Sequence, residues 1–203
     1  MLQAMINNND LIIKKLTEQG IISIYTAHSI RHFPANERKP VSAIRRMVQE
    51  GIYIGYGLYE KKEAESLLCY AFFTMLPNCG NILLDYYAVM EQYRSRGIGS
   101  YFLQQLKKEI KDYEGILIET ENPDYSKDDN EKLVRSKRIT FYEGNGAFFT
   151  GILAEVFGVH YKVFFLPVLK TPTQKKLLAD FDAIYRHMLS QENYETHVRI
   201  SAT

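Results

Sequence analysis

The residues with the clearest chemical potential form an arginine- and glycine-rich run, residues 94–100, between an apolar segment and apolar residues at helical spacing. A strand that turns through glycines into a helix presents unpaired backbone N–H groups at the positive end of the helix dipole. Glycine lets a phosphate approach the backbone, and arginine adds positive charge. The run therefore predicts a diphosphate site made by Arg94, Ser95, Arg96, Gly97, Ile98, Gly99 and Ser100.

Two other nucleotide-binding patterns do not fit this run. The dinucleotide fingerprint has a third glycine where this chain has Phe102, and the Walker loop ends in Gly-Lys-Ser/Thr, which is absent. On spacing alone, a tight turn with solvated arginines is an alternative interpretation.

The elements that must position the run alternate between strand and helix patterns. Strand patterns occur at residues 11–16, 52–58, 67–76, 82–89 and 115–121, and as a final hairpin at 147–157 and 161–168. Helical spacing occurs at 22–33, 41–50, 98–111 and 128–142, and a charged turn at 61–65. The first of these helices is expected to bury Ile22, Tyr25, Ile30 and Phe33 on one stripe. Further on, Thr171-Pro172-Thr173-Gln174 predicts a capped helix start.

Composition sets limits on the class of protein. The 203 residues are enough for one large domain with a proper core, and 46% of them are hydrophobic. A net charge of +1 argues against a general nucleic-acid or membrane-surface role. Only Cys69 and Cys79 occur, which fits a reducing cytoplasm. Residues 1–10 lack the apolar core of a signal peptide, and no run is long enough to span a bilayer. We therefore expect a cytoplasmic protein.

Two stretches together resemble the signatures of the GCN5-related N-acetyltransferases, the GNAT family. Residues 93–100 (Tyr-Arg-Ser-Arg-Gly-Ile-Gly-Ser) resemble its acetyl-CoA loop, Gln/Arg-x-x-Gly-x-Gly/Ala. Residues 139–146 (Ile-Thr-Phe-Tyr-Glu-Gly-Asn-Gly), about 45 residues further on, resemble its second signature, a helix ending in Tyr before a glycine turn. The resemblance covers about residues 10–168.

The resemblance implies an α/β acyl-CoA N-acyltransferase fold: a central mixed, mostly antiparallel sheet flanked by helices, here with a C-terminal helical extension. We expect a GNAT-type domain over residues 1–170 and a C-terminal helix and tail over residues 171–203. That helix either packs on the domain or pairs with a partner subunit, so a homodimer is compatible with the sequence.

The resemblance also implies transfer of an acetyl group from acetyl-CoA, as co-substrate, to a primary amine in a ternary complex. The backbone near Val89 would polarise the thioester carbonyl, and the diphosphate would lie on the amides of residues 94–100. Tyr142 matches the tyrosine that protonates the leaving thiolate. A core aromatic with a satisfied hydroxyl is the alternative for Tyr142.

The general base is not fixed by the family pattern. Asp85 is the only acidic residue of the apolar run 82–89, and Glu119 lies within the apolar run 115–121. A carboxylate in such a place tends to have a raised pKa, which suits a base. Each carboxylate could instead pair with an arginine, and ordered water alone could remove the amine proton.

The chain departs from the family pattern in two places. Many members carry Asn and Ala seven and four residues before the tyrosine, where this chain has Arg135 and Arg138. Arg135 could still reach a CoA phosphate, although the motif does not carry that contact over. After the turn, Gly146-Ala147-Phe148 stands where the family usually has Gly-Phe.

The remaining expectations concern ligands and rival functions. His28 and His32 are four residues apart, as metal-binding pairs are, but no third ligand stands at motif spacing, so we expect no metal. The acceptor is expected to be a small-molecule or peptide amine, with no nucleic-acid or membrane partner. The rival functions are a CoA-binding sensor or interaction module without turnover, and transfer of a longer acyl group.

Overall fold

The computed structural model describes residues 10–61 and 66–203. Residues 62–65, and with them most of the expected charged turn at 61–65, lie outside this description. So do residues 1–9, on which the expectation about a signal peptide rests.

The described residues form a mixed sheet with the strand order β1-β2-β3-β4-β5-β7-β6-β8. β4 and β5 are parallel, whereas β1 with β2, β5 with β7, β6 with β7 and β6 with β8 are antiparallel. The strands are β1 (Leu11–Lys15), β2 (Tyr53–Glu60), β3 (Leu67–Thr74), β4 (Asn81–Val89), β5 (Gly115–Glu121), β6 (Phe148–Val156), β7 (Val159–Pro167) and β8 (Val198–Ala202).

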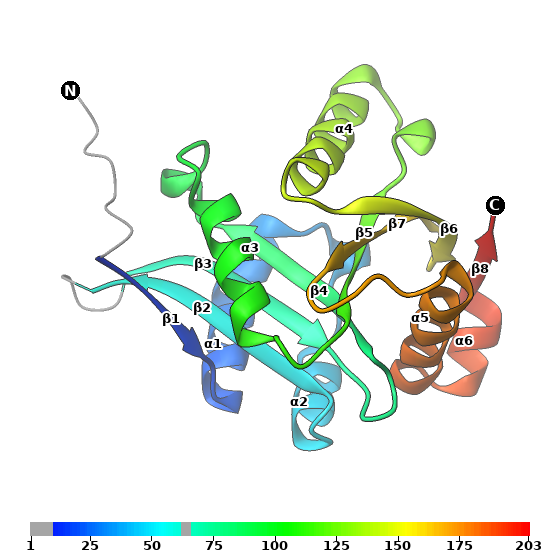
Figure 1. Cartoon of the computed structure of the whole chain (residues 1–203), viewed down its shortest axis with the longest axis horizontal. Helices are drawn as coiled ribbons and strands as arrows, with labels where there is room; N and C mark the ends of the chain where they lie inside the picture. The colour runs from blue at the N-terminus through cyan, green and yellow to red at the C-terminus, as the bar shows by residue number, and fades with distance from the viewer. Residues whose placement is uncertain (1–9, 62–65) are drawn as a thin grey trace. The chain divides into compact units, whose positions relative to one another are not determined.

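Helices flank the sheet, and two of them, α5 and α6, lie between β7 and β8 in the chain (Figure 1). The α-helices are α1 (Glu18–His32), α2 (Val41–Gln49), α3 (Ile98–Glu109), α4 (Asp129–Gly144), α5 (Gln174–Met188) and α6 (Gln191–His197). Short 3₁₀ turns are η2 (Ala35–Glu37), η3 (Glu91–Tyr93) and η4 (Pro123–Tyr125). The predicted fold class, a mixed sheet with flanking helices and a C-terminal helical extension, is confirmed.

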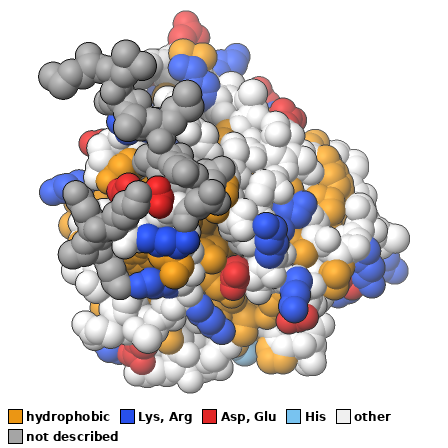
Figure 2. Space-filling view, turned by 60° about the vertical axis from the view of Figure 1, so that its left-hand side comes forward, with side chains coloured by type: hydrophobic (Ala, Val, Ile, Leu, Met, Phe, Trp, Pro, Cys, Tyr) orange, Lys and Arg blue, Asp and Glu red, His pale blue; other side chains and the backbone are white. Residues whose placement is uncertain are grey.

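The chain divides into two compact units, which the strand β4 joins. The first unit comprises Met1–Phe73 and Tyr86–Glu109, and the second comprises Thr74–Asp85 and Ile110–Thr203. On the face shown in Figure 2, Lys and Arg side chains are dispersed among apolar and uncharged groups, in keeping with the formal net charge of +1.

In the first unit, helices cover both faces of the strands because side chains alternate along β4. Tyr87 stacks on Phe102 of α3, with ring centroids 5.8 Å apart. The preceding Tyr86 contacts Tyr25 of α1 at 5.3 Å. α3 and α1 therefore lie on opposite sides of this part of the sheet (Figure 1).

The predicted apolar stripe of α1 is wrong at two residues, Ile30 and Phe33. Phe33 is the half-buried residue that follows the helix. Ile21, Ile22, Ile24 and Tyr25 are buried, but Ile30 is 70% exposed. At 3.6 residues per turn, Ser29 continues the buried face from Ile22 and Tyr25, and Ile30 lies one step of about 100° away from it. Ser29 is accordingly 3% exposed.

The C-terminal segment differs from the sequence expectation in its start and its end. α5 begins at Gln174 rather than at Pro172, because the Thr173 hydroxyl accepts the Lys176 N–H at 3.3 Å and Thr173 has extended dihedral angles. The sequence analysis predicted neither α6 nor β8. β8 pairs with β6 from Val156↔Val198 to Ile152↔Ala202, and its mostly exposed residues give little apolar signal.

A buried polar contact anchors α5 to the start of β4 within the second unit. The Asn81 amide donates to Asp180 Oδ2 at 2.7 Å, and Lys176 Nζ lies 2.5 Å from Asp180 Oδ1. Asn81 and Asp180 are 0% and 4% exposed. The hydrogen bond to Asp180 is the main cause that raises the pKa of Lys176.

We expect Asp180→Ala to lower the free energy of unfolding by about 3 kcal/mol, because it leaves a buried amide without its acceptor. Urea unfolding of the purified variant measures this loss. Asp129→Ala, at an exposed position in the first turn of α4, is the matched control and should cost less than about 1 kcal/mol. Equal stability of the two variants would show that the contact does not anchor α5.

Candidate active site

The predicted phosphate-binding run lies between the end of β4 and the first turn of α3, as expected. Ser95 and Gly97 have positive φ angles of 60° and 75°. The first helical bond of α3 runs from Tyr101 N to Gly97 O at 3.0 Å. By helix geometry, the N–H groups of that first turn have no carbonyl partner within the helix and point along the positive end of its dipole.

Two hydrogen bonds fix this run against β4. The Tyr87 hydroxyl donates to Gly99 O at 2.6 Å, and Arg94 Nε donates to Val89 O at 3.1 Å. Arg96 lies over the Tyr93 ring, 5.9 Å from its centroid. These contacts connect the run to the end of the strand.

The surface over the run is open. Residues 94–97 are exposed, and a Cβ placed on Gly97 would meet no atom within 4 Å. A ligand phosphate could therefore approach the backbone at Gly97, where any larger residue would occupy the approach and strain the backbone.

In the second unit, the two candidate carboxylates lie where the paired part of two parallel strands ends. The pairing of β4 with β5 runs from Asn81↔Gly115 to Leu84↔Ile118. Asp85 and Glu119 are the next residue on each strand, and both are half-buried. The two residues that the sequence left as alternatives thus occupy matching positions on neighbouring strands.

Tyr185 of α5 contacts one of these two carboxylates, Glu119. Its hydroxyl lies 2.7 Å and 2.9 Å from Glu119 Oε1 and Oε2 and donates to that carboxylate. Burial raises the pKa of Tyr185 well above its ordinary value, and the charges of Glu119 and Asp85 and the neighbouring Tyr161 raise it further. The hydroxyl is therefore a permanent donor at neutral pH, and donation favours the charged form of the carboxylate that accepts it.

The sequence analysis missed Tyr185. The residue belongs to the apolar face of α5, which also buries Leu177, Phe181, Ile184 and Met188. The only available signal was chemical: a tyrosine on a buried face usually brings its hydroxyl to a polar partner.

Tyr142 lies near the end of α4, which continues to Gly144 before the turn through Gly146, where φ is 93°. The predicted end at Tyr142 is thus two residues early. The side chain is 6% exposed. Burial raises the pKa of Tyr142 to about 12, against an opposing effect of Arg138. Tyr142 is in the same unit as the carboxylate pair, whereas Val89 and residues 94–100 belong to the first unit.

Arg135 makes two ion pairs and a backbone hydrogen bond within the second unit. Its guanidinium lies 3.0 Å from Glu121 and 3.0 Å from Glu131, and Nη1 donates to Asn122 O at 2.9 Å. Arg138 lies 2.9 Å from the other Glu121 oxygen. The Arg135 side chain is only 9% exposed, so the two family departures, Arg135 and Arg138, join α4 to the end of β5.

The histidine pair of α1 is packed against a tyrosine. His28 and His32 stack with ring centroids 6.1 Å apart, and His32 Nδ1 lies 2.9 Å from the Tyr70 hydroxyl. Burial is the first cause that lowers the pKa of each histidine. Within residues 10–61 and 66–203, no group of three His, Cys, Asp or Glu side chains could hold a metal ion, and no helix is long and apolar enough to cross a membrane.

Sequence comparisons identify no relative of this chain: no protein-family model and no curated protein sequence matches it. Solved structures do match. The ribosomal-protein-S18-alanine N-acetyltransferase of Escherichia coli aligns with a TM-score of 0.55 and 15% identity, over 80% of this chain and 96% of that one. The spermidine N-acetyltransferase of Vibrio cholerae, solved with CoA and spermine, aligns with a TM-score of 0.58 and 11% identity, over 80% and 98%.

A third matching structure is also an acetyltransferase by its description. A Bacteroides thetaiotaomicron protein described as a GNAT-family acetyltransferase aligns with a TM-score of 0.64 and 13% identity, over 85% of this chain and 93% of that one. The protein therefore has the fold of the GNAT-family acetyltransferases, as the two sequence motifs predicted. Identities of 11–15% establish the shared fold alone.

Proposed function

We propose that the protein is an N-acetyltransferase that moves an acetyl group from acetyl-CoA to a primary amine by direct attack in a ternary complex. The observation that carries the proposal is the first turn of α3. It combines a helix N-terminus, positive φ angles at Ser95 and Gly97, and open space over Gly97. In a GNAT fold, this is where a diphosphate can bind to backbone N–H groups.

The structural comparisons support the same choice of ligands. The Vibrio cholerae enzyme was solved with CoA and with spermine, a polyamine. For the present protein we infer only the same classes of ligand, a CoA thioester and an amine. The acceptor of this protein stays open between small molecules and peptides, and a cytoplasmic location and a homodimer stay predictions.

The acetyl-CoA site would be built around residues 94–100 and Val89. The N–H groups of the first turn of α3 would bind the diphosphate, and the exposed Arg96 would add positive charge. Backbone N–H donors near Val89 would polarise the thioester carbonyl. No metal takes part in the proposal.

The proton transfers would use side chains of the second unit. As the amine nitrogen forms its bond to the acetyl carbon, Glu119 accepts a proton from it, directly or through water. As the carbon–sulfur bond breaks, the Tyr142 phenol gives its proton to the leaving thiolate. Exchange with water then restores both side chains.

Glu119 is preferred over Asp85 because Tyr185 holds it by a defined contact. The donated hydrogen bond fixes the orientation of the carboxylate that would accept the proton. Tyr185 would act as a positioning residue, supplied by the C-terminal helix α5.

The first prediction concerns CoA. We expect Gly97→Ala to weaken CoA binding about tenfold or more, because the added Cβ takes the place of a phosphate bound to the backbone. Binding of acetyl-pantetheine, which lacks the diphosphate, should be unchanged. Calorimetry with both ligands measures the difference.

Gly51→Ala is the matched control for this experiment. Gly51 has a φ of 73°, and a Cβ added there would also meet no atom within 4 Å, so the variant carries the same backbone strain away from the run. If Gly97→Ala and Gly51→Ala bind CoA equally well, the diphosphate is bound elsewhere.

The second prediction concerns the base. We expect Glu119→Gln to lower kcat about a hundredfold or more and to remove the acidic limb of the rate–pH profile. Tyr185→Phe should keep the limb but move it to higher pH, because loss of a donated hydrogen bond makes the carboxylate easier to protonate. Steady-state kinetics across pH, at saturating acetyl-CoA, measures both effects.

Asp85→Asn is the comparison variant. An acidic limb that disappears in Asp85→Asn but not in Glu119→Gln would make Asp85 the base. A limb retained in both variants would favour ordered water alone.

The third prediction concerns the acid. We expect Tyr142→Phe to lower kcat about a hundredfold or more while CoA affinity changes little, because only the proton donor is removed. Because burial raises the pKa of Tyr142 to about 12, this phenol should cause no basic limb in the neutral pH range. A Phe variant with near-normal turnover would contradict the assignment, and complete absence of thiol release in the wild type with every amine would favour a CoA-binding module without turnover.

A further inference from the structure

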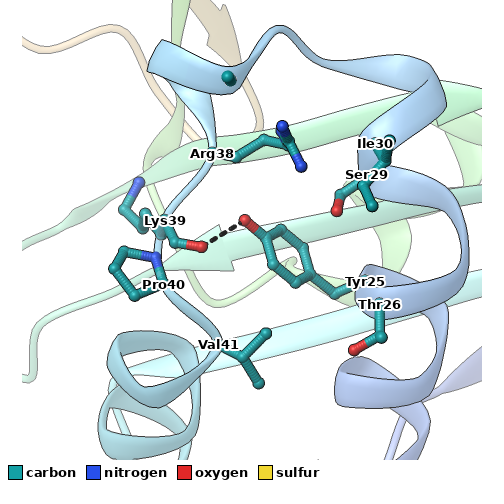
Figure 3. Close-up of a pocket in the computed structure, with 9 residues that line it drawn as sticks. Tyr25, Thr26, Ser29, Ile30, Arg38, Lys39, Pro40 and Val41 are labelled. Atoms are coloured by element: carbon teal, nitrogen blue, oxygen red, sulfur yellow. Dashed lines mark hydrogen bonds between the residues drawn. The ribbon is translucent and has the colours of Figure 1, made fainter.

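A pocket of about 390 Å³ opens in the first unit, between α1 and the segment that leads into α2. Tyr25, Thr26, Ser29 and Ile30 line it from α1, and Ala35 and residues 38–41 line it from the facing segment (Figure 3). Its volume is within the range of pockets that bind small organic molecules. None of the residues to which the proposed acetyl transfer assigns a role lines it.

Two buried tyrosines hold the facing segment in place. The Tyr25 hydroxyl donates to Lys39 O at 2.6 Å. The Tyr86 hydroxyl accepts from Lys39 N at 2.9 Å and donates to Glu37 O at 2.9 Å. These hydrogen bonds fix the backbone on both sides of Arg38, whose side chain extends across the pocket toward Ser29 (Figure 3).

The polar groups of the pocket are suited to an anion. Its lining contains two cations, Arg38 and Lys39, and no acidic side chain. Lys39 Nζ lies over the Tyr86 ring, 5.4 Å from its centroid. Arg38 Nε is buried and has no hydrogen-bond partner among the described residues.

The apolar groups of the pocket suit a compact hydrophobic body. Ile30 is 70% exposed and Val41 is 38% exposed, although both are large apolar side chains. They stand at opposite sides of the pocket, one on α1 and one at the start of α2 (Figure 3). A ligand with an apolar body between them would cover surface that water now contacts.

We propose that this pocket binds a small organic carboxylate, with its charged group on Arg38 and Ser29 and its apolar body between Ile30 and Val41. The planar guanidinium matches a carboxylate in geometry and can donate two parallel hydrogen bonds to it. Of the two lining cations, Lys39 has its Nζ over the Tyr86 ring, and Arg38 is the one that extends across the pocket (Figure 3). One positive charge in that place balances one negative charge, which favours a carboxylate over a phosphate.

The test uses benzoate as the anionic probe and benzamide as its neutral counterpart of the same shape. In an NMR titration of the whole protein without acetyl-CoA, benzoate should give saturable shifts in α1 and residues 38–41. Benzamide should bind at least about tenfold more weakly, because it offers no charge to the guanidinium. Equal binding of the two probes would overturn the proposal.

Arg38→Gln should weaken benzoate binding about tenfold or more, and Arg38→Lys, which keeps the charge without the fork, should give a smaller loss. Arg31→Gln removes the same charge from an exposed position of α1 outside the pocket and should leave binding nearly unchanged. Benzoate binding that is retained in Arg38→Gln, or lost equally in Arg31→Gln, would show that Arg38 is not the anchor. Melting temperatures of all variants check that they are folded.

The bound carboxylate belongs either to the acceptor amine itself or to a separate ligand. The first of these alternatives rests on the proposed acetyl transfer. If the acceptor carries it, Arg38→Gln should raise KM for an amino acid but not for the corresponding amino acid amide. If the carboxylate belongs to a separate ligand, benzoate should change the rate of acetylation of the amino acid amide. Benzoate should not compete with that amide in this case. The binding experiment needs no turnover, so its failure and a failure of the proposed activity are distinguishable.

Discussion

Buried polar groups of the sheet must find partners, and in the second unit one helix supplies them. Asn81 begins β4 and Glu119 follows the apolar residues 116–118 of β5. Asp180 and Tyr185 of α5 meet them at 2.7 Å each. Because an unpaired buried amide or carboxylate is costly, the docking of α5 is specified by these two contacts as well as by its apolar face. The C-terminal extension is thus part of the candidate active site.

The same requirement explains the two arginines of α4. Glu121 ends β5 with a side chain that is 15% exposed, and it lies about 3 Å from both Arg135 and Arg138. Two guanidinium groups around one carboxylate connect the helix that carries Tyr142 to the strand that carries Glu119. The departures of this chain from the GNAT pattern therefore have a structural use, and the proposed CoA site does not depend on them.

In the first unit, tyrosine hydroxyls connect elements by hydrogen bonds to backbone groups. Tyr87 bonds to Gly99 and so connects β4 to the first turn of α3. Its neighbour Tyr86, on the other face of the strand, bonds to residues 37 and 39 beside α1. Two consecutive residues of one strand thereby fix the proposed phosphate site on one side and the proposed carboxylate pocket on the other.

The sequence by itself determined the strand and helix order as far as α5, the turn at residues 94–100 and the place of Tyr142 near the end of a helix, because these depend on periodicity and on glycines and caps a few residues apart. It also placed Asp85 and Glu119 within strands. Only the tertiary structure decided that they follow the paired part of β4 and β5 at matching positions, and that Tyr185, 66 residues from Glu119, is the donor to Glu119. It also decided that Ile30 is exposed and that Arg135 is paired. Local patterns describe one element at a time, whereas the partner of a buried polar group depends on how distant elements dock.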